Sequence, residues 1–360
     1  MADESKVMQF SVVDNPAPRI PDYTENLNSK NYVPWGVDNN FPVFIDGLYK
    51  GSATLRAIID GTVKFICGNG ISVSDEAAKW KDEINRRGDT LEDLVESTGT
   101  DLLKYRGFAI QVIYNKLGEI KELYSLDFGR IRLSADGKKV YYAKKWGQWT
   151  SKYDVYDAFD RSKIDPNNPT QIYVFKSGAR TCYPMPRYEG AFLDCLAEQA
   201  ASKYVLGNLS NGLAARTVIT LPNHSGLLTE DDKRAVEESI RSRFCGPDAE
   251  KRFFIFWQNE AEENIDIKPI QVVDESTKFN SIRAAARENI FVSMAAQPCL
   301  FGLPNKNNGF TQQEFAECFA LYQRTQVQGY QKQIERALEK ILNAKGAITI
   351  LPFKIESEDE

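Results

Sequence analysis

Long helices with apolar stripes, flanking one small insert, are the feature that most constrains this 360-residue chain. Apolar residues recur at spacings of three and four and predict helices over about 188–214, 276–297 and 311–345. Between the first two lies an insert over about 217–272 with two short strand patterns. Because three long helices are hard to bury against one small insert, we expect identical subunits to cover them by packing helix against helix.

The stripes on the first two helices identify the side chains expected to make that packing. They are Phe192, Leu196 and Tyr204 on the first helix, and Phe279, Ile282 and Ile290 on the second. A stripe of this kind is, on its own, typical of an ordinary core face. In the insert, strands at 218–221 and 253–256 flank a helix that Thr229 caps.

Residues 50–185 combine helix and strand patterns, as expected of an α+β unit. One helix is expected to begin after Ser52 and to end at Gly68, and a second to begin at the N-cap Thr90. Short apolar runs separated by glycine-containing turns then predict strands at 108–114, 123–126, 131–133, 140–142 and 172–175.

The two ends of the chain differ from this middle part. Residues 1–50 are rich in Pro, Asn and Asp and are expected to form an extended arm, whose aromatic anchors dock on their own domain or on a neighbouring subunit. Residues 346–360 are expected to be a short acidic tail. The first residues lack the pattern of a secretory signal, and no apolar run approaches the ~20 residues that span a bilayer, so we expect a cytosolic protein without a membrane partner.

The charge balance argues against a protein whose main task is to grip nucleic acid. Lys and Arg number 45 against 50 Asp and Glu, which gives a net charge of −5. Gripping DNA requires many cations set against phosphates, whereas a protein that merely lets DNA pass does not need them. The six cysteines are scattered without a C-x-x-C pair and are expected to be free thiols.

The motifs give little support to an enzyme. His224 is the single histidine, which excludes any site built from two histidines of one chain. The Gly68-Asn69-Gly70 sequence lacks the pattern of a phosphate loop and is typical of a helix C-cap. We therefore expect no enzymatic activity, no cofactor and no metal. The alternative is a metal-dependent nuclease that uses carboxylates such as Asp154, Asp157 and Asp160, or Asp231 and Asp232. The first three are typical of a solvated acidic loop.

Several short segments, taken in order, resemble the portal proteins of tailed double-stranded DNA bacteriophages. They are the helix-to-strand passage 101–109, the strand pair at 118–126, the helix start 188–191, the segment 290–304 with its Phe301-Gly302-Leu303-Pro304 sequence, and 334–338 in the last helix. Each segment is short, and the match lies in their order and spacing over roughly residues 50–345.

The resemblance implies an α+β, mostly helical portal-like fold with a minimal or absent crown. Its parts are an N-terminal arm (1–50), an α+β wing (51–186), two stem helices (187–216 and 274–297), a small clip (217–273), a tunnel loop (298–310), a long wing or crown-side helix (311–345) and the acidic tail (346–360).

The same resemblance implies a structural role at the capsid vertex. The chain would form a ring, typically a dodecamer, through which double-stranded DNA passes non-specifically during packaging and ejection. It would be assembled in the host cytoplasm, become part of the virion, and contact the terminase large subunit, a head-completion or adaptor protein, and the major capsid and scaffold proteins. The loop Asn305, Lys306, Asn307, Asn308 and Gly309 would face the DNA channel, although the residues alone are typical of a solvated connection. An adaptor that forms no pore remains an alternative.

Overall fold

A computed structural model of the chain divides into two compact units. The first comprises Met1–Leu196 and Ile290–Glu360, and the second comprises Ala197–Asn289. The structure describes residues 20–27, 29, 31–147, 152–178, 182–210, 217–222, 229–244, 254–258, 266–269, 276–303 and 312–353. Among these residues, no helix is long and apolar enough to cross a membrane.

Three helices open the first unit, and the sequence explains where two of them begin. They are α1 (Phe41–Gly51), α2 (Ala53–Cys67) and α3 (Leu91–Tyr105). The hydroxyl of Ser52 accepts a hydrogen bond from the Leu55 amide at 3.1 Å and caps α2. Thr90 and Asp93 form a capping box at the start of α3. Both predicted helix starts are confirmed.

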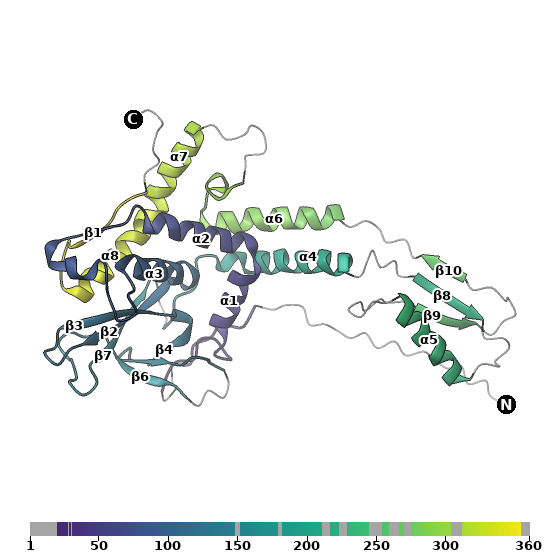
Figure 1. Cartoon of the computed structure of the whole chain (residues 1–360), viewed down its shortest axis with the longest axis horizontal. Helices are drawn as coiled ribbons and strands as arrows, with labels where there is room; N and C mark the ends of the chain where they lie inside the picture. The colour runs from purple at the N-terminus through teal and green to yellow at the C-terminus, as the bar shows by residue number, and fades with distance from the viewer. Residues whose placement is uncertain are drawn as a thin grey trace. The chain divides into compact units, whose positions relative to one another are not determined.

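A six-stranded sheet lies against these helices (Figure 1). Its strands are β2 (Gly107–Tyr114), β3 (Ile120–Leu126), β4 (Ile131–Leu133), β5 (Lys139–Tyr142), β6 (Asp154–Ala158) and β7 (Thr170–Lys176). In the described residues they are ordered β3-β2-β7-β6-β5-β4, with β6 and β7 parallel and the other neighbours antiparallel. Helix α3 packs on β2 and β3, and α2 packs on α3.

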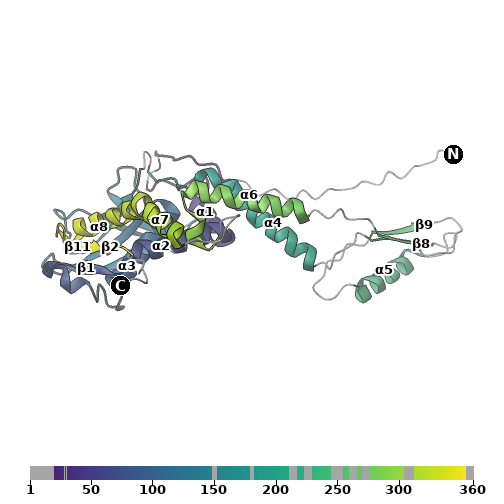
Figure 2. The same cartoon turned by 90° about the horizontal axis from the view of Figure 1, so that it is seen from above.

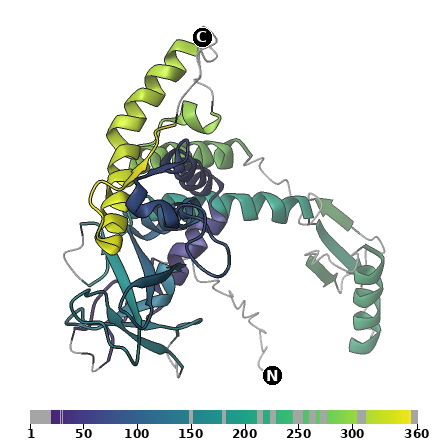
Figure 3. The ribbon, with the colours of Figure 1, turned by 60° about the vertical axis from the view of Figure 1, so that its left-hand side comes forward.

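The C-terminal part of the chain returns to cover α2 and α3. Its elements are the 3₁₀ turn η5 (Pro298–Phe301), α7 (Gln312–Tyr322), the π-helical turn η6 (Gln323–Val327), α8 (Gln328–Leu342) and β11 (Ile348–Ile350). Figure 3 shows α7 and α8 as one continuous yellow-green to yellow rod. Further 3₁₀ turns are η1 (Asp75–Trp80), η2 (Phe128–Arg130) and η3 (Glu189–Ala191).

Strand β11 pairs with β1 (Ile71–Val73), and a glycine permits the close approach of the two segments. Gly68 ends α2 at φ +62°, and a Cβ atom there would lie 1.9 Å from the Leu351 carbonyl oxygen. A side chain at position 68 is thus incompatible with the pairing. The expected helix C-cap at Gly68 is confirmed.

The expected extended arm over residues 1–50 is wrong from residue 41 onward, because α1 begins there. Asn40, Phe41 and Pro42 resemble a turn in sequence, but proline is also favoured in the first turn of a helix, where its missing N–H costs nothing. The preceding segment docks on its own chain: the Trp35 ring stacks on Tyr183 at 4.4 Å.

Arg132, on strand β4, holds this N-terminal segment against the sheet. Its buried guanidinium donates to the Asn39 side chain and, at 2.8 Å, to the Asn39 carbonyl oxygen, and it lies over the Trp35 ring. Burial lowers the pKa of Arg132 to about 10, which still leaves it charged at neutral pH. Because these acceptors lie 93 residues away in the chain, the contact ties the N-terminal segment to the sheet.

Two further expectations need correction. Residues 154–158 form strand β6, where an acidic loop was expected, because the backbone pairs with β5 and β7 while Asp154 stays exposed and Asp157 pairs with Lys139. Residues 348–350 form β11, where only a tail was expected, because Ile348 and Ile350 are buried. Residues 354–360 lie outside the described part.

The second unit contains most of two helices and a small α/β module. Its elements are the larger part of α4 (Phe192–Ser210), β8 (Thr217–Pro222), α5 (Glu230–Phe244), β9 (Phe254–Gln258), β10 (Asp266–Pro269) and the first part of α6 (Ser276–Met294). The three strands are ordered β10-β8-β9, and Thr229 with Asp232 caps α5 as expected. Helices α4 and α6 lie side by side, with the Tyr204 ring stacked on Phe279 at 4.1 Å (Figures 1 and 2).

A buried carboxyl group holds the passage from α3 to the sheet. Asp101 accepts a hydrogen bond from the Phe128 amide at 2.8 Å. Burial, helped by the nearby Asp127 carboxylate, raises the pKa of Asp101 to about 7, against the opposing effects of the Phe128 hydrogen bond and Lys104. Since the pKa is higher in the folded chain than in the unfolded one, the folded state binds the proton more tightly, and stability falls as pH rises from about 4 to about 7.

We therefore predict that Asp101→Asn removes this dependence. Asparagine still accepts the Phe128 bond but does not titrate. Between pH 5 and pH 7, the stability of the variant relative to the natural chain should rise by about 2–3 kcal/mol, at about 1.4 kcal/mol per pH unit. Urea unfolding at several pH values measures this difference. Parallel pH profiles for the two proteins would show that Asp101 does not titrate in this range.

Candidate functional site

The segment between α6 and α7 is the candidate functional site. The expected channel residues Asn305, Lys306, Asn307, Asn308 and Gly309 lie outside the described residues. The structure does describe both flanks of this segment, residues 298–303 and 312 onward, and shows how each is held.

The upstream flank is anchored by Phe301. Its ring packs against Phe65, Phe291 and Tyr322 with centroid separations of 5.9–6.2 Å. On α2, Gly61 makes room for the ring, because a Cβ atom at this position would lie 2.8 Å from a ring carbon of Phe301. The turn η5 is therefore seated directly on the backbone of α2.

The downstream flank is held by the same face of α2. The hydroxyl groups of Thr62 and Tyr322 share a buried hydrogen bond of 2.8 Å. Burial raises the pKa of Tyr322 to about 12, so the phenol stays neutral and can use its proton in this bond. Phe319 packs its ring against Phe65 at 5.6 Å. Thus both ends of the undescribed segment rest on one aromatic cluster around α2.

A π-helical turn follows directly in the downstream helix. Gln323 lies in this turn with its amide buried, and neither its Oε1 nor its Nε2 has a partner among the described residues. The Thr325 hydroxyl donates to the Leu321 carbonyl oxygen at 2.8 Å. Gln326, which interrupts the apolar stripe of the predicted helix 311–345, accepts a hydrogen bond from Arg187. Turns of this type occur often at functional positions of helices.

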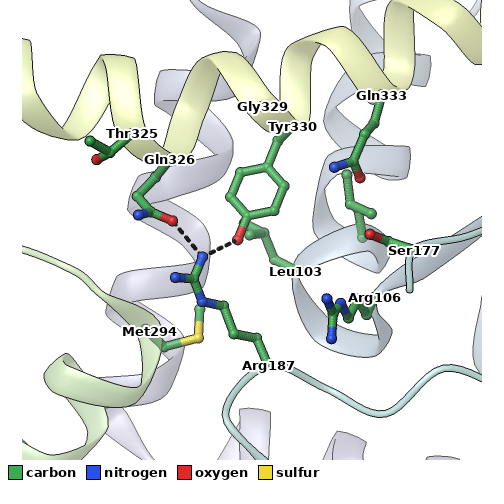
Figure 4. A pocket seen from close by; sticks show the side chains of 11 residues that line it. Leu103, Arg106, Ser177, Arg187, Met294, Thr325, Gln326, Gly329, Tyr330 and Gln333 are labelled. Atoms are coloured by element: carbon green, nitrogen blue, oxygen red, sulfur yellow. Dashed lines mark hydrogen bonds between the residues drawn. The ribbon is translucent and has the colours of Figure 1, made fainter. Parts of the chain in front are cut away.

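A pocket of about 390 Å³ adjoins this turn (Figure 4). Its walls come from α3, the end of β7, the segment before η3, the end of α6 and the helix η6–α8, and the lining residues are Leu102, Leu103, Arg106, Ser177, Arg187, Met294, Thr325, Gln326, Gly329, Tyr330 and Gln333. The lining contains two arginines and no acidic residue. No sequence signal predicted this pocket, since its residues come from five separate segments.

The six expected helix-packing residues have different environments. Phe192 and Ile290 are buried in the first unit, and Leu196 packs against the same core. Tyr204 and Phe279 stack on each other, as described above, and Ile282 is 38% exposed. The sequence pattern therefore selected mainly side chains that their own chain already covers.

The most exposed large apolar side chains on these helices lie beside the stripe. Leu193 and Leu206 on α4 are 64% and 63% exposed, and Val292 on α6 is 79% exposed. Searching each helix for single apolar residues one or two positions away from the stripe would have found them.

The carboxylates of the alternative nuclease have structural partners. Asp157 forms an ion pair with Lys139 at 2.6 Å, Asp160 accepts hydrogen bonds from Ser162, and Asp232 caps α5. In the described part of the chain, no three Asp, Glu, Cys or His residues are grouped to hold a metal ion. The five described cysteines are free thiols, as expected; His224 lies outside that part.

The Thr62–Tyr322 bond gives a direct test of how the downstream flank is held. Thr62→Val keeps the side-chain shape but leaves a buried hydroxyl without its partner, so the free energy of unfolding should fall by about 1–3 kcal/mol. Adding Tyr322→Phe removes the unpartnered hydroxyl and should restore most of the loss. Urea unfolding of the two single variants and the double variant measures the coupling, and simple additivity of the single effects would contradict it.

Comparison with known proteins gives a consistent result for the fold. No family model matches the chain, and no curated protein matches its sequence. Among solved structures, a chain from the neck of an empty gene transfer agent particle has a TM-score of 0.56 at 17% identity, covering 86% of this chain and 84% of that one. A chain from the neck of the native particle, computed with C12 symmetry, has a TM-score of 0.55 at 16% identity, covering 86% and 83%.

A third structure carries a family description. It is an HK97-family phage portal protein from Corynebacterium diphtheriae, with a TM-score of 0.50 at 10% identity, covering 82% of this chain and 88% of that one. The resemblance seen in the sequence is thus confirmed in three dimensions. The chain has the fold of a phage portal protein.

Proposed function

We propose that this chain is a portal subunit, which assembles into a ring at the capsid vertex and forms the channel for DNA packaging and ejection. The observation that carries the proposal is the exposure of large apolar side chains on α4 and α6. Leu193, Leu206 and Val292 are each more than 60% exposed in a single subunit. Exposed apolar side chains on paired helices favour association, and a heterologous contact that repeats around an axis closes into a ring.

The parts of the ring follow the order of the elements. In this assignment the wing is 51–186, the stem helices are 187–216 and 274–297, the clip is 217–273, and the tunnel loop is 298–310. The six-stranded sheet, the helices α4 and α6, and the β8–β10 module with α5 support these assignments. A ring of twelve subunits is supported by the similarity to a particle neck computed with C12 symmetry.

The charge of the chain is suited to a conduit. A channel must let DNA slide, and every phosphate neutralised by a fixed cation slows it by adding affinity. The excess of acidic residues fits weak contact, with Lys306 as the single cation in the Asn305–Gly309 loop. The terminase large subunit, a head-completion or adaptor protein, and capsid and scaffold proteins are the proposed partners, and the virion is the proposed location.

The ring contact predicts a selective loss of assembly. Leu206→Glu combined with Val292→Glu should weaken subunit association more than about tenfold, because burying an unpaired carboxylate costs several kcal/mol. Since both side chains are exposed in one subunit, the thermal stability of the subunit should hardly change. Sedimentation velocity measures assembly, and Leu117→Glu, at a site 84% exposed in a β-turn, is the control. Rings that survive the double substitution would place the contact elsewhere.

The channel assignment of the loop is tested separately. Lys306→Ala should leave ring assembly intact and alter the retention of packaged DNA, with a weaker dependence on salt. Packaging reactions at two ionic strengths provide the measurement, and Lys116→Ala, an exposed lysine outside the loop, serves as the matched control. Failure of the Lys306 variant to fold or assemble would show that residues 298–310 have a structural role instead.

A further inference from the structure

Two arginines without an acidic partner line the pocket beside the π-helical turn. Arg106 follows the last residue of α3, and Arg187 lies just before η3. Within the described residues neither guanidinium forms an ion pair, and Arg106 makes no side-chain hydrogen bond. Figure 4 shows Arg187 reaching toward Gln326 and Tyr330, with Arg106 on the other side of Leu103.

The bonds that Arg187 does make leave most of its donors free. Its Nη1 atom donates to the side-chain Oε1 of Gln326 and, at 3.2 Å, to the Tyr330 hydroxyl, and both acceptors are neutral. An arginine has five N–H groups, so the Nε and Nη2 donors remain without an acceptor in the described chain. Arg106 adds a second fork of donors, and both residues are exposed to an incoming group.

Another polar group that lines the pocket also lacks a hydrogen-bond partner among the described residues. The Oε1 atom of Gln333 is buried and has no hydrogen-bond partner in the described residues. A rotation of its amide by half a turn would present the N–H₂ group to the same position. A buried polar group left unpaired is costly, so a ligand that supplies both charge and hydrogen-bonding atoms would be favoured here.

The two arginines favour an oxyanion as the ligand of this pocket. The shape of the pocket favours a single side chain over a nucleic acid. Guanidinium forks bind carboxylates and phosphates through paired, charge-assisted hydrogen bonds. A concave cavity of about 390 Å³ admits a single projecting side chain, whereas the phosphates of a DNA duplex lie on a broad convex surface that cannot enter it. A carboxylate on a protruding segment therefore fits better than nucleic acid.

We propose that an Asp or Glu side chain of a neighbouring copy of this chain enters the pocket and pairs with Arg106 and Arg187. The inference rests on the ring of the proposed function. In a ring each subunit supplies one such pocket and one acidic side chain, so every pocket receives a carboxylate from its neighbour. The chain also carries more acidic than basic residues. Because Arg187 also holds Gln326, the contact links the neighbour to the helix that follows the tunnel loop.

Zero-length cross-linking of lysine variants tests this pairing. In Arg187→Lys and, separately, Arg106→Lys, the new amine can be coupled by a carbodiimide to any carboxylate that contacts it. Subunits labelled with ¹⁴N and ¹⁵N are mixed before assembly, and the cross-linked peptides are identified by mass spectrometry. We expect peptides that join Lys at position 187 or 106 to an acidic residue of a differently labelled subunit.

Arg56→Lys is the matched control. Arg56 is exposed and forms an ion pair with Asp60 of its own chain at 3.3 Å, so its variant should give cross-links within one subunit only. If rings form and the control couples to Asp60, but the pocket variants couple to nothing or only within one chain, the neighbour's carboxylate is excluded while the portal function stands. If no rings form, the proposed function fails and this inference fails with it.

A second measurement avoids dependence on lysine geometry. Arg106→Gln combined with Arg187→Gln should raise the subunit concentration for half-maximal ring assembly by about tenfold or more, because both substitutions remove charge-assisted hydrogen bonds to the neighbour's carboxylate. The melting temperature of the isolated subunit should change little, because both side chains are exposed. Unchanged assembly would overturn the proposal.

Discussion

Burial of apolar surface is the constraint on which the rest of the structure depends. In the core around α2, α3 and α8 it is met within the chain, since these helices cover one another and the sheet, and residues such as Ile58, Phe108 and Ile334 are fully buried. On α4 and α6 it is not met, because Leu206 and Val292 remain in solvent. Under the proposed function, such a subunit folds on its own core and buries the exposed side chains of α4 and α6 against copies of itself.

The two flanks of the proposed channel loop are anchored on the same helix, α2. Phe301 on one side and Tyr322 on the other both rest on α2, at Gly61 and Thr62. The helix beyond Tyr322 widens into a π turn with a buried, unpartnered Gln323 amide, an arrangement that costs free energy. Such a cost persists where function requires it, and here it lies next to the proposed channel loop and the two-arginine pocket.

Local signals in the sequence predicted the local structure well. The capping residues Ser52 and Thr90, the glycine after α2 and the apolar run of β2 are determined by neighbours in the chain, and all were interpreted correctly. Helix α1 was missed because Asn39 and Asn40, with Pro42 close behind them, resemble a turn as much as a helix start. Strand β11, the bonds of Arg132 and the pocket depend on residues far apart in the sequence, which a pattern within one window cannot reveal. For the helices, periodicity identified the faces turned inward and overlooked the exposed ones.

If the exposed side chains of α4 and α6 are buried against identical neighbours around an open axis, the purified protein should form rings on its own. Electron microscopy, with class averages computed without imposed symmetry, measures this. We expect closed rings, close to twelvefold, with a central opening wide enough for a DNA duplex. Single subunits, open chains or closed particles without a central hole, at concentrations where the subunit is folded, would refute the proposed ring.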